Sequence, residues 1–220
     1  METIGFLELN SIAKGMEVAD CVLKTAEVKL VFSRAGCPGK YYLLFTGEVA
    51  AVQESIDAGC RLGGQFVVDH CVIPRVHPQV ISAIHSATMV DNMRAIGVME
   101  FFSVTASVYA ADAAAKAADV QLLDVRLGTG IGGKSFVVLT GEVAAVSEAV
   151  SCGISTPNAE GMVVSSVVIP GPHPELLNAL MEGEDYGRRI SREATYHTGI
   201  CSGQAGHAGA CHLKPGRKPI

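Results

Sequence analysis

The sequence contains no tryptophan, few aromatic residues and no excess of positive charge. Its formal net charge is −5, with 17 Lys and Arg against 22 Asp and Glu, whereas nucleic-acid-binding proteins usually present a basic face. No apolar run is long enough to span a bilayer, and Met1 is followed almost directly by IGFLELN, without the basic and apolar regions of a signal peptide. We therefore expect a cytosolic, cytoplasmic protein that binds neither nucleic acid nor membrane.

The seven cysteines are odd in number and irregularly spaced. In a reducing cytosol such cysteines are more often free thiols or metal ligands than partners in disulfides. Cys37 stands out because it lies in the turn-like stretch SRAGCPGKYYLLF, where glycine and proline leave nothing bulky to cover its sulfur. No nucleophile, base and orienting residue occur together in a suitable context, so we expect no enzyme activity.

The two halves of the chain repeat each other. The run IGFLELNSIAKGMEVAD from Ile4 aligns with IGVMEFFSVTASVYAAD from Ile96, TGEVAAV occurs in both halves, and VIPRVHPQVISAI aligns with VIPGPHPELLNAL. The second half carries two short insertions, one at the Cys37 turn and one near ISTPNAEG. Insertions at turns with the elements preserved indicate two copies of one fold. The cysteine is not repeated, because Ile131 occupies the aligned position.

Within each copy, stretches typical of strands alternate with stretches typical of helices. The first copy predicts strands at Ile4–Leu9, Val28–Phe32, Tyr41–Phe45 and Phe66–Ile73, a helix over 12–26, a second helix starting at Thr46 and Gly47 with Glu48 in its first turn, and a short helix from Pro78. The order β-α-β-β-α-β is that of the ferredoxin-like fold, in the α+β class. We expect one such domain at 1–86, a linker at 87–95, a second domain at 96–183 and a flexible, disordered tail at 184–220.

Four motifs recur in both copies: K-[TA]-A-[ED]-V, a G-K turn, T-G-[ED]-V and I-P-x-x-H-P. Together they resemble bacterial microcompartment shell domains fused in tandem, and LELNSIAKGMEVAD, CPGK and GIGGK are similar to the T type of the propanediol-utilisation shell. The resemblance implies a structural protein that forms a homotrimer shaped like a hexagon. Such trimers pack edge to edge with other shell proteins in the wall of a microcompartment, and an encapsulated redox enzyme is a further partner that it allows.

The resemblance also implies a central pore lined by the turns between the second and third strands of each copy. The expected pore residues are Gly36, Pro38, Gly39, Gly130, Ile131 and Gly132. Three Cys37 thiolates would meet at the threefold axis and hold one [4Fe-4S] cluster per trimer, as members of the T type do. The cluster would serve electron transport or would itself be carried across the shell. Zinc held by three thiolates and a water is an open alternative, as is a cysteine that binds no metal.

Three basic residues correspond to the family's contacts between neighbouring tiles. Lys24 and Lys116 are expected at matching helix ends, and Arg75 lies in the I-P-x-x-H-P motif. The second copy has Gly171 where the first has Arg75. The two copies are therefore not expected to make equivalent edge contacts.

Other motifs favour less specific interpretations. The stretch GTGIGGKS satisfies the Walker A pattern, but phosphate binding needs a helix at the lysine and the following SFVVLT is typical of a strand. The His-Pro context of His77 and His173 predicts packing or capping rather than catalysis. The tail carries residue types that bind zinc at a spacing that matches no zinc motif, namely His197, Cys201, His207, Cys211 and His212.

A second function remains open at this point. Ferredoxin-like domains also form trimeric regulators that bind nucleotides or other small ligands. Such a regulator would not tile into sheets, whereas a shell protein would.

Overall fold

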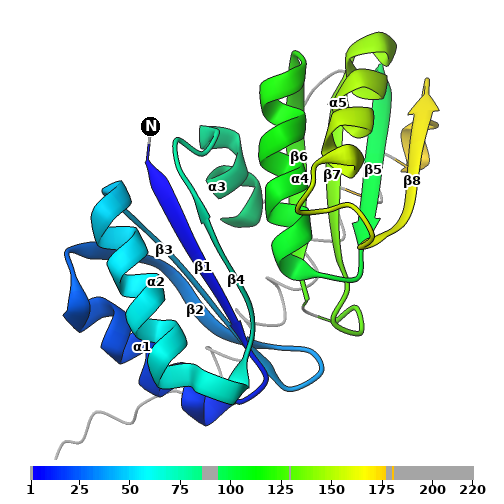
Figure 1. The fold of residues 1–220 in the computed structure, drawn as a ribbon. Helices are drawn as coiled ribbons and strands as arrows, with labels where there is room; N and C mark the ends of the chain where they lie inside the picture. The colour runs from blue at the N-terminus through cyan, green and yellow to red at the C-terminus, as the bar shows by residue number, and fades with distance from the viewer. Residues whose placement is uncertain (1, 86–93, 129, 177–179, 181–220) are drawn as a thin grey trace, which may run out of the picture. The chain divides into compact units, whose positions relative to one another are not determined.

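Each repeat forms a four-stranded antiparallel sheet with two helices side by side over one face (Figure 1). The computed structural model describes residues 2–85, 94–128, 130–176 and 180. The first repeat comprises β1 (Thr3–Leu9), α1 (Ile12–Thr25), β2 (Val28–Gly36), β3 (Lys40–Gly47), α2 (Val49–Gly63), β4 (Val67–Ile73) and α3 (Pro78–His85), with a short 3-10 helix at Gly64–Phe66. The second comprises β5 (Ala95–Phe101), α4 (Val104–Ala117), β6 (Val120–Leu127), β7 (Ser135–Gly141), α5 (Val143–Ser155) and β8 (Val163–Pro170).

The strand orders are β2-β3-β1-β4 and β6-β7-β5-β8, and all neighbouring strands are antiparallel. This order confirms the predicted pair of ferredoxin-like units. The predicted linker, 87–95, lies mostly outside the described residues, although Ala95 already belongs to β5. The predicted tail, 184–220, lies outside them entirely.

The first helix of each repeat begins at an equivalent serine. The side chain of Ser11 accepts a hydrogen bond from the Lys14 amide at 3.3 Å, and Ser103 does the same for Ala106. Each serine satisfies one of the amides that the first helical turn leaves without a partner. The repeated sequence thus positions both helices in the same way.

The second helix starts later than the sequence predicted. Thr46 and Gly47 belong to β3, and α2 begins at Val49 with Glu48 just before it. Gly47 pairs with both Thr3 and Val28, so the sheet holds this residue in strand conformation. Strand pairing on both sides therefore outweighs the local helix signal.

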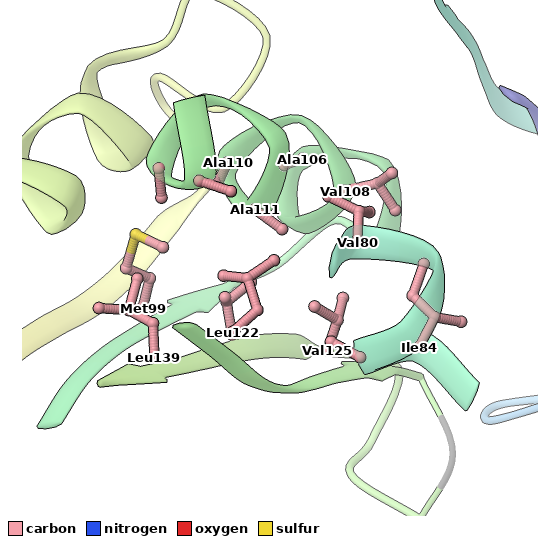
Figure 2. Close-up of a cluster of buried hydrophobic side chains, with 14 of the residues drawn as sticks. Val80, Ile84, Met99, Ala106, Val108, Ala110, Ala111, Leu122, Val125 and Leu139 are labelled. Carbon is pink, nitrogen blue, oxygen red and sulfur yellow. The ribbon is translucent and has the colours of Figure 1, made fainter. Parts of the chain in front are cut away.

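Most of the buried apolar side chains lie between sheets and helices, and the largest cluster extends across both repeats (Figure 2). Val80 and Ile84 reach it from α3, which belongs to the first repeat, and they pack near Val125 of the second sheet. The two repeats thus share the largest apolar cluster, whereas a second cluster lies within the first repeat alone. None of the described helices combines the length and apolar character needed to span a bilayer.

Candidate functional site

The predicted pore residues and the predicted edge residues lie at opposite ends of the sheets. The β2–β3 turn follows the Gly36–Lys40 pair, at the end of the sheet where Leu9 pairs with Tyr41. Arg75 follows β4 at the other end, where Ile4 pairs with Ile73. The same separation holds in the second repeat. The fold therefore places the two glycine-rich turns away from the predicted edge residues.

The two turns contact each other. The Cys37 amide donates a hydrogen bond to the Gly128 carbonyl at 2.9 Å, and the Tyr42 hydroxyl donates to the Cys37 carbonyl at 3.2 Å. Burial raises the pKa of Tyr42 well above its usual value, so this hydroxyl keeps its proton. Both backbone groups of Cys37 are thus fixed, while its thiol is half-buried and has no hydrogen-bond partner among the described residues.

Glycine is required where the turns approach each other. Gly128 has a φ of 63°, and a Cβ built on it would lie 2.1 Å from the Tyr42 hydroxyl oxygen. A Cβ on Gly133 would lie 2.9 Å from the Pro38 Cδ. A side chain at either position would force the two turns apart.

A matched pair of substitutions tests this packing. Gly128→Ala should destabilise the protein by roughly 3 kcal/mol, because strain at positive φ adds to a clash with Tyr42. Gly130→Ala should cost only about 1 kcal/mol, since its φ is 75° but nothing lies within 4 Å of the added Cβ. Urea unfolding measures both, and equal losses would contradict the proposed role of the contact.

A lysine–glutamate pair supports each turn, and the sequence analysis missed it. Lys40 binds Glu8, whose side chain is only 2% exposed, and Lys134 binds Glu100 at 2.9 Å. Burial raises the pKa of Glu8, and the neighbouring Lys40 opposes that rise. Glu8 and Glu100 occupy the same position in the two aligned apolar strands, and this repeated glutamate could have indicated a buried ion pair.

The Lys134–Glu100 pair also bears on the Walker A pattern GTGIGGKS, which contains this lysine. Lys134 is bonded to Glu100, and strand β7 begins at the next residue. No helix starts at this lysine, so the arrangement that binds phosphate is absent from this turn. The sequence prediction of a strand here is confirmed.

Cys37, the predicted metal ligand, belongs to the described residues, whereas the His and Cys residues of the tail lie outside them. Within one chain, the described residues contain no group of three or more His, Cys, Asp or Glu side chains that could hold a metal ion. The equivalent turn presents Ile131, which has no donor atom. A metal bound at Cys37 by three or more such side chains would therefore need ligands other than the described residues of the same chain.

The basic residues at the opposite end show how the two repeats differ. Arg75 has a φ of 51°, and the equivalent Gly171 has a φ of 56°. Both repeats thus use a left-handed conformation here, which glycine adopts without strain. Lys24 and Lys116 close the first helices and bind Asp20 and Asp112, each at 2.6 Å. Their contacts between tiles remain predictions.

The histidines of the two I-P-x-x-H-P motifs make different contacts. The His173 Nδ1 accepts from the Glu175 amide at 3.2 Å, which is a capping contact. The His77 amide donates to the Asp112 carboxylate at 2.8 Å, and the His77 Nδ1 is buried without a partner among the described residues. The capping contact of His173 is one of the two roles, packing or capping, that the sequence predicted for these histidines.

We define the internal seam as the contact of residues 76–85 with α4 and β6 of the second repeat. Gln79 lies along the edge strand β6: its Nε2 donates to the Val120 carbonyl at 3.4 Å and its Oε1 accepts from the Leu122 amide at 2.8 Å. Val80 and Ile84 are buried beside these contacts. The internal seam thus combines apolar packing with hydrogen bonds to the sheet edge.

No described residue gives the equivalent face of the first repeat such a cover. Four apolar side chains of α1 and β2 are 39–57% exposed, whereas the side chains at the equivalent positions of α4 and β6 are at most 8% exposed. The exposed residues are Ile12, Met16, Leu23 and Leu30, and their buried equivalents are Val104, Val108, Ala115 and Leu122.

In the internal seam the cover is formed by α3 of the first repeat. The equivalent segment of the second repeat carries apolar side chains that are exposed. Leu176 and Leu180 are 40% and 39% exposed, while the equivalent Val80 and Ile84 of α3 are 0% and 7% exposed. One chain therefore carries counterparts of both faces of the internal seam, and within the described residues neither face is covered. We refer to these two exposed faces as the halves of a second seam.

Comparison with known proteins identifies the repeated unit. The BMC domain family matches residues 3–76 and 95–172. The chain is 43% identical to the bacterial microcompartment shell protein PduT of Citrobacter freundii, over 83% of this chain and 99% of that protein.

Two solved structures are also similar. A microcompartment protein from Desulfitobacterium hafniense superimposes with a TM-score of 0.76 at 48% identity, over 81% of this chain and 99% of its own. A fused permuted hexameric shell protein of the RMM microcompartment superimposes with a TM-score of 0.53 at 27% identity, over 69% of this chain and 81% of its own. The duplicated sheet, the paired turns and these matches agree, and the chain belongs to the BMC-domain family of bacterial microcompartment shell proteins.

Proposed function

We propose that this protein is a non-enzymatic tile of a propanediol-utilisation-type microcompartment shell, built from three chains around a central metal centre. The observation that carries the proposal is the second seam, whose two halves are exposed on one chain. A contact between unlike faces repeats from copy to copy and closes into a ring if the rotation allows. One relative is described as a fused hexameric shell protein, and three chains of this protein supply six domains.

The second seam has polar as well as apolar elements. In the internal seam, the Asp112 carboxylate binds Lys116 and also accepts from the His77 amide. Asp20 binds Lys24 in the same way, and its other oxygen is without a partner among the described residues. We expect the His173 amide of the next copy to occupy that position. This hydrogen bond would then occur both within each chain and between successive chains of the ring.

Closing the ring would bring the Cys37 turns together at its centre. Each chain contributes one soft sulfur ligand, and its backbone is fixed by Gly128 and Tyr42. Three thiolates leave one vertex of a [4Fe-4S] cube for an external ligand, and a bound cluster would supply one-electron transfer across the shell. Zinc with three thiolates and a water is chemically compatible with the same residues.

A charge in the second seam should break the ring. Met16→Asp places a carboxylate at a position whose equivalent, Val108, is fully buried, and should weaken trimer formation by at least roughly ten-fold. Val49→Asp is the matched control, because Val49 and its equivalent Val143 are both exposed, at 53% and 43%. Analytical ultracentrifugation measures the assembly. A Met16→Asp protein that remains trimeric at low concentration would contradict the proposed seam.

A further inference from the structure

We infer that successive chains of the ring are joined by an ion pair between Lys29 of one copy and Glu175 of the next. This inference rests on the proposed trimer and goes beyond it. It assigns different chemistry to the contact between chains and to the contact within a chain. The assignment follows from comparing each residue of the internal seam with its equivalent in the second seam.

The internal seam uses a neutral amide at the sheet edge. Strand β6 is an edge strand, so its outward backbone groups need partners. The Gln79 amide bonds the Val120 carbonyl and the Leu122 amide, which flank Gln121 on both sides. An amide suits this place because it offers one donor and one acceptor.

The second seam replaces both glutamines. Glu175 is aligned with Gln79 in the repeated motif, and Lys29 is aligned with Gln121. The local backbone is the same in both segments, since the Val80 amide donates to the His77 carbonyl and the Leu176 amide to the His173 carbonyl, each at 3.0 Å. Glu175 is therefore set up to approach β2 as Gln79 approaches β6.

A carboxylate makes only half of the glutamine's contacts. Glu175 can accept from the Leu30 amide, but an ionised carboxylate cannot donate to the Val28 carbonyl. Lys29 lies between those two residues, and its ammonium group can reach the carboxylate and offset its charge. The paired change from two glutamines to a glutamate and a lysine keeps the contact electrically balanced.

Within the part of the chain that the structure describes, neither residue is engaged by a competing charged partner. Lys29 and Glu175 are both exposed, and among the described residues neither makes an ion pair. The nearby cation Lys24 is bound to Asp20, as Lys116 is bound to Asp112 inside the internal seam. The Lys29 ammonium group of one copy and the Glu175 carboxylate of the next are thus both available to pair with each other.

The consequence is that the two kinds of seam respond differently to salt. Ions screen charges at a partly exposed contact, whereas they leave amide hydrogen bonds and apolar packing largely unchanged. Raising the salt concentration should therefore separate the chains of the ring before it disturbs the packing of α3 on the second repeat.

Charge-exchange variants of the full chain test this inference by sedimentation equilibrium at low and high sodium chloride. Lys29→Glu should weaken trimer formation at least roughly ten-fold at low salt, because two carboxylates would face each other. The double variant Lys29→Glu with Glu175→Lys should restore it. The double variant Lys29→Gln with Glu175→Gln reproduces the internal seam, so it should remain trimeric and lose the salt dependence of the wild type.

The outcomes separate this inference from the proposed function. A wild-type trimer whose stability is unaffected by Lys29→Glu and by salt would overturn the ion pair and leave the ring intact. A wild-type chain that forms no trimer at any concentration would overturn both. Weakening by Lys29→Glu without rescue by the exchange would also overturn the pairing, because the lysine would then act through some other group.

Discussion

Anaerobically purified Cys37→Ser protein will contain neither iron nor acid-labile sulfide, whereas the wild-type trimer will hold about four of each. A serine hydroxyl is a poor ligand for iron at neutral pH, and the equivalent residue Ile131 offers no donor to replace it. Because the symmetry of the proposed ring repeats the substitution three times, all of the proposed protein ligands would be lost together. We therefore expect a complete loss rather than a partial one.

Iron and sulfide assays, with EPR spectroscopy of the reduced protein, measure this result. Cys152→Ser is the matched control, since Cys152 is also half-buried but lies on α5 and binds Glu148. Its iron content should equal that of the wild type. Iron retained by Cys37→Ser would disprove the proposed ligand, and stoichiometric zinc in place of iron in the wild type would favour the zinc alternative.

Lys40→Met will be the most destabilising of the single lysine substitutions, with a loss of about 3–5 kcal/mol in the free energy of unfolding. The substitution leaves the Glu8 carboxylate buried without its cation, and that side chain is only 2% exposed. Lys134→Met removes the equivalent pair, in which the side chains are 44% and 35% exposed, and should cost about 1 kcal/mol or less. Urea unfolding of both variants gives the comparison.

The loss should also depend on pH in a definite direction. Burial already raises the pKa of Glu8 above its ordinary value of 4.5, and removal of Lys40 takes away the interaction that lowers it. The native variant then binds a proton more readily than the unfolded chain, so its stability relative to the wild type should recover as the pH falls from neutral towards 4.5. A loss that stays constant over this range would show that Glu8 is not the source.

The order of the elements could be predicted because each carries its own periodicity, and because two copies report it twice. The boundaries were less accurate. Residues 33–36 were not predicted to be in a strand, but they extend β2 because they pair with β3 up to Gly36. The start of α2 was misplaced because the sheet holds Gly47. Both differences come from strand pairing, which a local pattern does not contain.

The candidate site was predicted in part. The Cys37 turn was singled out because of its glycine and proline content and because the second copy has no cysteine at the aligned position. The buried Glu8–Lys40 pair was missed because the two residues are far apart in the sequence and only the sheet brings them together. The second seam was also missed, since it depends on comparing the exposure of equivalent residues, and exposure is known only once the chain is folded.

The presence of the Cys37 turn and the Gly128 turn in one chain has a consequence for the composition of the proposed ring. Since both turns belong to one polypeptide, every copy that is translated delivers one sulfur-bearing turn and one sulfur-free turn in equal numbers. Separate single-domain proteins would meet in ratios set by their expression levels, and their rings would contain variable numbers of thiols. In the proposed ring, the fusion of both domains in one chain would make the number of thiols at the centre independent of how much protein the cell produces.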